Sequence, residues 1–235
     1  MTALVKKKPA YLDEDRLLVA VDCIIFGFDG HELKALLVKR SMEPEKNKWS
    51  LLGGFVKKNE SVDDAANRIL SQLTGLTDIY MEQLYCFGAV HRDRADRVIS
   101  IAYFALIKIA DYPDPLLKEH RAQWFALGHL PASLIFDHHQ MIQLAKEHLQ
   151  QKAVNHPVGF TLLPHKFTLQ QLQSLYEAIY ESTFDKRNFT KKILALQLLH
   201  KLNEKEKQNS RKGSFLFVFH KKKYEQFQKE NIRFL

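Results

Sequence analysis

Short apolar runs separated by polar turns fill the first half of the chain. Two such runs, at 17–28 and 33–40, flank Asp29-Gly30, a dipeptide that favours a tight hairpin turn because Gly accepts a positive φ. Their β-branched and aromatic content predicts strands. The same pattern predicts further strands, at 49–56, 79–90, 98–109 and 124–127.

Two segments among these strands have helical spacing instead. One begins at Ser61, a candidate N-cap followed by two aspartates in the first turn, and Gly75 is expected to end it. The other is predicted over 136–151, with Asp137 as its cap. Strands, helix, strands and helix in this order predict a layered α/β sandwich.

The pattern changes after His156-Pro157. An amphipathic helix is predicted over 167–180, with Thr168 and Gln171 forming a capping box. A short loop leads into a second helix over 186–200. A basic segment and an apolar run follow, and this order is typical of a winged helix-turn-helix.

Charge separates the same two regions. The 235 residues include 35 Lys and Arg and 27 Asp and Glu, a net charge of +8. Residues 1–156 hold 20 basic and 20 acidic residues, whereas 157–235 hold 15 and 7. We therefore expect two domains with these bounds, and a polyanionic partner for the second.

The lack of a recognisable targeting signal and the small number of cysteines predict a cytoplasmic protein. No apolar region follows the polar start of the chain, and the longest apolar stretch, 17–28, is far short of the roughly 20 residues that a membrane span needs. The two cysteines, Cys23 and Cys86, lie in predicted strands, where we expect them to be buried and unpaired. We expect no membrane association.

The predicted helix over 186–200 has the character of a recognition helix. Phe189, Ile193 and Leu196 share one face, so its polar side chains point outward. Arg and Lys can read guanine, Asn can read adenine, and Lys also binds phosphate. A solvated basic face, or a surface for RNA or a partner protein, is the alternative. The candidate DNA-binding residues are Lys186, Arg187, Asn188, Lys191 and Lys192, with Arg211, Lys212 and 221–223 in the hairpin.

A motif in the first domain resembles the Nudix box, G-x5-E-x7-R-E-U-x-E-E-x-G-U, where U is a bulky aliphatic residue. It consists of Gly54, Glu60, Arg68, Gly75 and Leu76, and the resemblance extends over roughly residues 17–150. It implies a Nudix α/β/α sandwich, in which Arg68 pairs with a carboxylate, here Glu60.

The chain departs from this box at the positions that hold metal. Active Nudix enzymes use glutamates to bind Mg²⁺, which prefers oxygen ligands. This chain has Ile69, Gln72 and Leu73 there, and only Glu60 remains. We therefore expect no catalytic residues, no bound metal and no cofactor, but a pocket that still binds a ligand.

Polar and aromatic residues on the strands and loops that line a Nudix cleft are the candidate effector contacts. A sugar needs hydroxyl partners and an aromatic ring, and a nucleotide needs stacking and cations for its diphosphate. For the residues between 91 and 97, a solvated loop is the alternative. The candidates are Asp22, Arg40, Trp49, Phe55, His91, Arg92, Asp93, Arg97 and Tyr103.

Over nearly its full length the chain resembles Nudix-related transcriptional regulators, in which a degenerate Nudix domain precedes a winged helix. The matching stretches are 22–28, 49–56, 60–66, 136–138 and 186–189. The resemblance implies a homodimer that binds a palindromic operator in double-stranded DNA. The family senses arabinose or ADP-ribose, and this chain looks more like the arabinose-type branch.

The favoured interpretation is thus an inactive Nudix domain that senses a pentose such as L-arabinose and controls DNA binding. Three alternatives stay open: an ADP-ribose-sensing regulator of NAD metabolism, a Nudix hydrolase of ADP-ribose or another nucleoside diphosphate derivative, and an RNA-binding adaptor.

Overall fold

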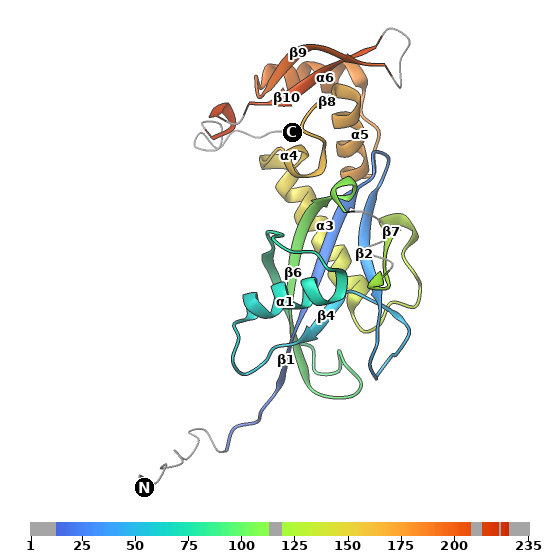
Figure 1. Cartoon of the computed structure of the whole chain (residues 1–235), viewed down its shortest axis with the longest axis vertical. Helices are drawn as coiled ribbons and strands as arrows, with labels where there is room; N and C mark the ends of the chain where they lie inside the picture. The colour runs from blue at the N-terminus through green and yellow to red at the C-terminus, as the bar shows by residue number, and fades with distance from the viewer. Residues whose placement is uncertain (1–12, 113–118, 208–212, 221, 226–235) are drawn as a thin grey trace.

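The computed structural model of the chain describes residues 13–112, 119–207, 213–220 and 222–225. A larger part built around a sheet carries a smaller part of helices and a hairpin at one end (Figure 1). The larger part has the layered α/β arrangement that the sequence predicts, and the smaller part has the predicted helices and hairpin of a winged helix.

A long central strand, β1 (Leu18–Phe28), organises the main sheet. It runs parallel to β6 (Val98–Lys108) over its whole length. Two strands pair antiparallel with its other edge. The first half of β1 pairs with β4 (Leu52–Phe55), and the second half pairs with β2 (Leu33–Lys39). The predicted hairpin is confirmed, with φ 102° at Gly30, but its connection is a loop over 29–32 rather than a tight turn. The sheet is completed by β3 (Trp49–Ser50), β5 (Glu82–Phe87) and β7 (Ala122–Ala126).

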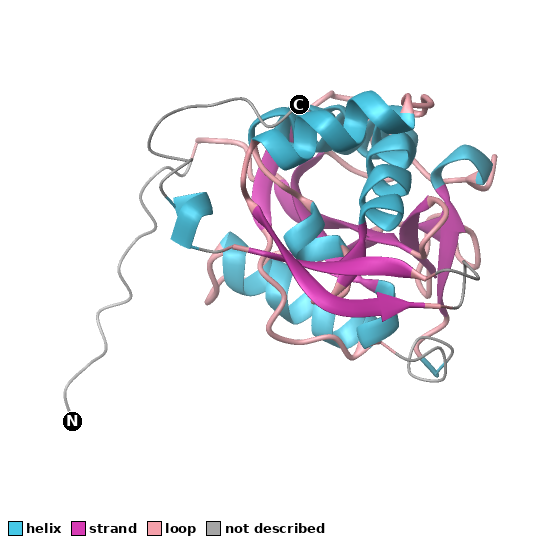
Figure 2. Cartoon of the chain, turned by 90° about the horizontal axis from the view of Figure 1, so that it is seen from above, coloured by secondary structure: helices cyan, strands magenta, loops and turns pink. Residues whose placement is uncertain are grey.

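Helices cover both faces of this sheet (Figure 2). One face packs against α1 (Val62–Thr74), and the other packs against α3 (His138–Asn155). Short 3₁₀ turns occupy Ile109–Asp111 (η1) and Leu127–His129 (η2). The predicted ends of α1 are confirmed, because Ser61 caps it with Asp64 in a capping box and Gly75 closes it with φ 73°.

Two single residues in this domain differ from expectation, one in part and one in full. Asp137 is the N-cap residue of α3, as predicted, but its side chain makes no capping hydrogen bond because Arg92 holds it. Cys23 is buried as expected, whereas Cys86 is exposed because β5 is an edge strand whose side chains are largely uncovered.

The winged helix contains α4 (Gly159–Leu162), α5 (Leu169–Tyr180), α6 (Lys186–Ala195) and a three-stranded sheet. The sheet has the order β8 (Phe167–Thr168), β10 (Ser214–Phe219), β9 (Leu199–Glu206). The capping box of Thr168 and Gln171 is confirmed.

The second helix of the winged helix is shorter than the sequence pattern predicts. It ends at Ala195, and Gln197 has φ 53°, a left-handed conformation that stops a helix. The chain therefore reverses early, and the first half of the predicted basic segment, 201–206, lies in β9.

One apolar cluster extends through both domains. It joins sheet residues such as Phe26 and Phe104 to α3, and continues through Leu172 and Tyr176 of α5 to Phe189 of α6. Helix α6 therefore shares a core with the main sheet. Within the described residues, no helix is both long and apolar enough to cross a membrane.

Candidate ligand pocket and DNA-binding surface

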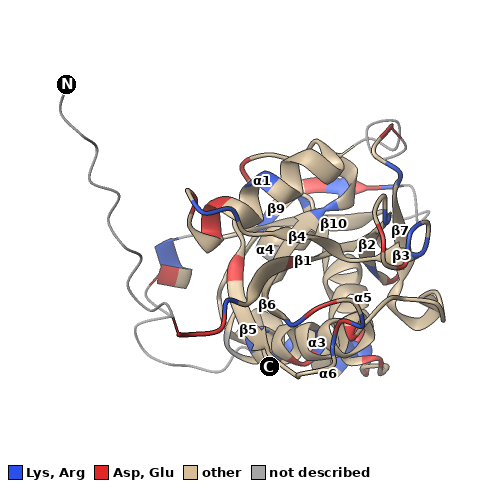
Figure 3. Cartoon of the chain, turned by 90° about the horizontal axis from the view of Figure 1, so that it is seen from below, with Lys and Arg blue, Asp and Glu red and all other residues tan. Residues whose placement is uncertain are grey.

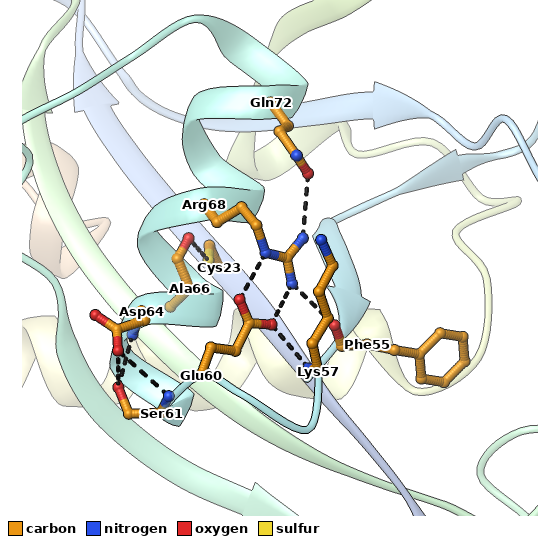
Figure 4. A network of polar contacts seen from close by, with 9 residues as sticks. All are labelled: Cys23, Phe55, Lys57, Glu60, Ser61, Asp64, Ala66, Arg68 and Gln72. Atoms are coloured by element: carbon orange, nitrogen blue, oxygen red, sulfur yellow. Dashed lines mark hydrogen bonds and ion pairs between the residues drawn. The ribbon is translucent and has the colours of Figure 1, made fainter. Parts of the chain in front are cut away.

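The retained part of the Nudix motif is a polar brace between the loop before α1 and the helix itself (Figure 4). Arg68 donates from Nε and Nη2 to the two carboxylate oxygens of Glu60, at 2.8 and 2.6 Å. The same guanidinium donates to the Phe55 carbonyl at 3.0 Å and to Gln72 Oε1 at 3.1 Å. The predicted pairing of Arg68 with Glu60 is confirmed.

This brace keeps Glu60 ionised. Hydrogen bonding from Arg68 lowers the pKa of Glu60 from 4.5 to about 2, and the backbone N–H of Lys57 adds to the effect. The one glutamate that remains from the motif is thus held in an ion pair with Arg68.

The positions that carry metal-binding glutamates in active enzymes have other roles here. Ile69 is buried against Gly54, where an added Cβ would lie 2.2 Å from Ile69 Cδ1. Gln72 contacts Arg68. Two nearby carboxylates are also engaged, since Asp63 accepts from Tyr103 and Asp64 belongs to the cap of α1. Among the described residues, no group of three or more His, Cys, Asp or Glu could hold a metal ion.

A separate pocket of about 420 Å³ lies at the N-terminal end of α3. The loop after β5 supplies His91, Arg92 and Arg94, and the segment before α3 supplies Phe136. Arg40 stacks over the Phe136 ring at 5.3 Å and is held by the carbonyls of the following loop. An aromatic ring beside several cations suits a phosphorylated or nucleotide-like ligand. Lining residues beyond these are Glu45, Lys48, Ser133, Leu134, Ile135 and Asp137.

Buried charges lie behind this pocket. Arg92 binds the Asp137 carboxylate through Nε and Nη2, at 3.0 and 2.7 Å, and lies 3.5 Å from Asp22 Oδ2. Ser100 donates to the same Asp22 oxygen at 2.5 Å. His138 accepts from the backbone N–H of Leu51 at 3.0 Å, and burial lowers the pKa of this histidine. The arrangement fixes the loop after β5 to the start of α3.

The structure brings four of the nine candidate effector residues together. His91 and Arg92 line the pocket, Arg40 stacks on Phe136 at its edge, and Asp22 contacts Arg92 from behind. The sequence pattern missed Phe136 and Asp137 as lining residues, although both lie in a stretch that matches the family.

The other five candidates lie elsewhere. Tyr103 is buried under α1, on the opposite face of the sheet from the buried charges. Trp49 packs edge-on against Phe125, and Phe55 is exposed at the end of β4. Asp93 and Arg97 hold the loop after β5 by bonding to its backbone.

The outward face of α6 is basic, as predicted. Phe189 and Ile193 are buried, and Asp185 caps the helix by accepting from the Asn188 N–H at 2.8 Å. Figure 3 shows basic residues along this helix. The candidate residues Lys186, Arg187, Asn188, Lys191 and Lys192 are all exposed.

Side-chain bonds set the turn that positions α6. Glu177 accepts from the backbone N–H of Phe184 at 2.9 Å, and Gln173 donates to the Phe184 carbonyl at 2.9 Å. Stacking of Phe184 on Phe189 then joins the turn to α6. The two helices of the motif are thereby held in a fixed geometry.

The predicted hairpin contacts can be placed only in part. Arg211, Lys212 and residue 221 lie outside the described residues, whereas Lys222 and Lys223 are exposed. The structure adds two exposed lysines that the sequence reading missed, Lys201 and Lys205 on β9, which lie 3.6 and 4.5 Å from the Phe215 ring centroid.

These features define a class of protein: a regulator in which a Nudix domain with an altered metal-binding face is joined to a DNA-binding winged helix. Family models agree, since the NUDIX domain matches residues 16–145 and the NrtR DNA-binding winged helix domain matches residues 159–219. The chain belongs to the NrtR family of NUDIX-domain transcriptional regulators.

Two characterised relatives are similar in sequence. The "ADPR responsive transcriptional repressor NtrR" of Acinetobacter baylyi is 33% identical over 75% of this chain and 72% of its own. The "ADP-ribose pyrophosphatase" of Methanocaldococcus jannaschii is 36% identical over 53% of this chain and 70% of its own.

Two solved structures of Shewanella oneidensis NrtR are also similar. One is a complex with a 27mer DNA, with 29% identity and a TM-score of 0.75 over 92% of this chain and 97% of that chain. The other is the NUDIX domain complexed with ADP ribose, with 31% identity and a TM-score of 0.50 over 58% of this chain and 91% of that chain.

Proposed function

We propose that this protein binds operator DNA through α6 and the β9–β10 hairpin, and that ADP-ribose in its Nudix domain controls this binding. The exposed basic face of α6, presented on a winged helix, is the observation that carries the proposal. In this assignment Arg187 and Asn188 contact bases, and Lys186, Lys191 and Lys192 contact phosphates.

The effector that we propose is ADP-ribose, not the pentose that the sequence analysis favoured. The pocket beside α3 combines the Phe136 ring and the His91 imidazole with the cations Arg94 and Lys48, which complement a base and a diphosphate rather than a neutral sugar. Relatives with a named effector or substrate also point to ADP-ribose. Arabinose sensing and a role in carbohydrate metabolism have no support in these comparisons.

Calorimetry with the full chain tests the effector. We expect ADP-ribose to bind and L-arabinose to give no heat beyond dilution. Phe136→Ala and Arg94→Ala should each weaken ADP-ribose binding, whereas Tyr85→Ala, an exposed aromatic on edge strand β5, should not. Binding of arabinose, or equal ADP-ribose affinity in all three variants, would reject this effector site.

Operator binding is proposed to require two copies. A homodimer would present two α6 helices to a palindromic site, with half-sites separated by a whole number of helical turns. We place the domain boundary at residues 156 and 157, directly after α3 ends at Asn155, and the protein in the cytoplasm, where operator DNA lies.

Hydrolysis of ADP-ribose is the second candidate, because Glu60 is retained and one relative is a pyrophosphatase. We expect no phosphate-bond cleavage with Mg²⁺ or Mn²⁺, since Ile69, Gln72 and Leu73 supply no carboxylate. Turnover that disappears in Glu60→Gln would instead favour the enzyme.

A further inference from the structure

The buried charges behind the ligand pocket include a carboxylate that has two possible partners. Asp137 is bound by the Arg92 guanidinium through two hydrogen bonds. It also stands at the N-cap position of α3, where its side chain makes no hydrogen bond to the helix. An aspartate at this position can cap the first turn of a helix and is favoured there by the helix dipole.

The charges around Arg92 do not favour an additional anion. Asp22 and Asp137 both face its guanidinium, so the three groups carry one net negative charge. His138 does not offset this charge, because burial lowers its pKa. A phosphate can therefore bind Arg92 well only if one carboxylate leaves.

Asp137 is the carboxylate that is able to leave. Asp22 is 5% exposed within β1 and accepts a hydrogen bond from Ser100. Asp137, by contrast, lines the pocket and adjoins the amide groups at the start of α3. When a ligand displaces the Asp137 carboxylate from Arg92, the carboxylate can instead accept hydrogen bonds from the amides in the first turn of α3.

The middle of α3 and the turns after it are bonded to the helix-turn-helix. Gln150 donates to the Ile179 carbonyl at 2.9 Å, and the Tyr180 hydroxyl donates to the Gln150 carbonyl at 3.0 Å. Lys146 also pairs with Glu181, in the turn before α6, at 2.7 Å. Along α3, which begins at His138, Lys146 and Gln150 lie roughly 12 and 18 Å from the pocket end of the helix.

We propose that Asp137 is the switch that couples the two domains: the diphosphate of the effector replaces it on Arg92, and Asp137 then caps α3. The altered start of α3 is transmitted along the helix to the turn before α6. This inference rests on the proposed function, since it takes an anionic effector in this pocket as given.

Asp137→Ser tests the first step, because serine caps helices but cannot form an ion pair with Arg92. Without its competitor, Arg92 should bind ADP-ribose at least about fivefold more tightly, within the usual range of coupling between sites. Operator affinity of the free variant should equal that of the effector-bound wild type, and ADP-ribose should no longer change it. Unchanged or weaker ADP-ribose binding with normal coupling would overturn the switch.

The double variant Gln150→Ala/Tyr180→Phe tests the second step, transmission from α3 to the turn before α6. It remains a test of the proposal if Asp137→Ser does not fold. It should bind ADP-ribose like the wild type but lose most of the effector's influence on operator affinity. Glu147→Gln, an exposed change on the same helix, is the control and should keep full coupling. Full coupling in the double variant would contradict the proposal.

Wild-type controls distinguish failure of the proposed function from failure of the Asp137 switch. If the wild type shows no effect of ADP-ribose on operator affinity, the proposed function fails. If the wild type is coupled and the variants remain equally coupled, the function stands and only the Asp137 switch is rejected.

Discussion

Ile69 and Gly54 are in direct contact, and this contact occupies the place where active Nudix enzymes have a metal-binding glutamate. A Cβ on Gly54 would lie 2.2 Å from Ile69 Cδ1 and 3.0 Å from its Cγ1. The isoleucine belongs to the apolar layer between α1 and the sheet. The loss of the glutamate is therefore a change in packing as well as in charge.

Gly54→Ala should destabilise the protein, because the added methyl group overlaps Ile69 in a packed core. We expect a loss of about 1–3 kcal/mol in the free energy of unfolding by urea. Gly88→Ala is the matched control, since no heavy atom lies within 4 Å of its added Cβ. Equal stability of the two variants would show that Ile69 does not pack as described.

Acid should reduce the contribution of Glu60 to stability. Its pKa is about 2 in the folded protein and near 4.5 when unfolded, so the contribution is complete above pH 4.5. It should be lost as the pH falls from about 4.5 towards 2. The stability difference between wild type and Glu60→Gln, measured by urea unfolding, should shrink over this range. Glu147→Gln, which removes an exposed carboxylate outside the brace, serves as the control.

His138 should give a second pH dependence at higher pH. Burial lowers its pKa below 6.5, so the unfolded chain takes up a proton there that the folded chain does not. Stability from this site should therefore fall as the pH drops below 6.5. Unfolding of His138→Asn should lack that part of the decline, whereas His139→Asn, at the exposed neighbour, should keep it. Identical pH profiles for both variants would contradict the assignment.

Lys191→Ala should weaken operator binding and make it less sensitive to salt. If Lys191 contacts one phosphate, the slope of log K against log salt should decrease in magnitude by about 1. Fluorescence anisotropy over a salt series measures both quantities. Lys58→Ala removes the same charge from an exposed position in the Nudix domain and should leave the slope unchanged. A slope that changes equally in both variants would indicate a general charge effect.

The sequence predicted most elements because their signals are local. The cap at Ser61, the hairpin at Asp29-Gly30 and the capping box at Thr168 each depend on residues close in the chain. The early end of α6 was missed because Gln197 adopts a left-handed conformation that glutamine does not favour by itself.

The pocket was harder to predict because it depends on strand register and on long-range pairing. Tyr103 lies beside Cys23 rather than Asp22 in the parallel pair, which places it under α1 and away from Arg92. No nearby residue in the sequence indicates that Arg92 pairs with Asp137, so the sequence analysis assigned Asp137 only the role of a helix cap. Cys86 is exposed because β5 lies at the edge of the sheet. The position of a strand within its sheet cannot be predicted from the sequence of that strand alone.

The most direct test is the affinity of the full protein for an operator duplex, selected from DNA of its own organism, with and without ADP-ribose. The account predicts sequence-specific binding whose Kd changes at least about fivefold when ADP-ribose is saturating and does not change with L-arabinose. A Kd that ADP-ribose leaves unaltered, or that arabinose shifts instead, would contradict it.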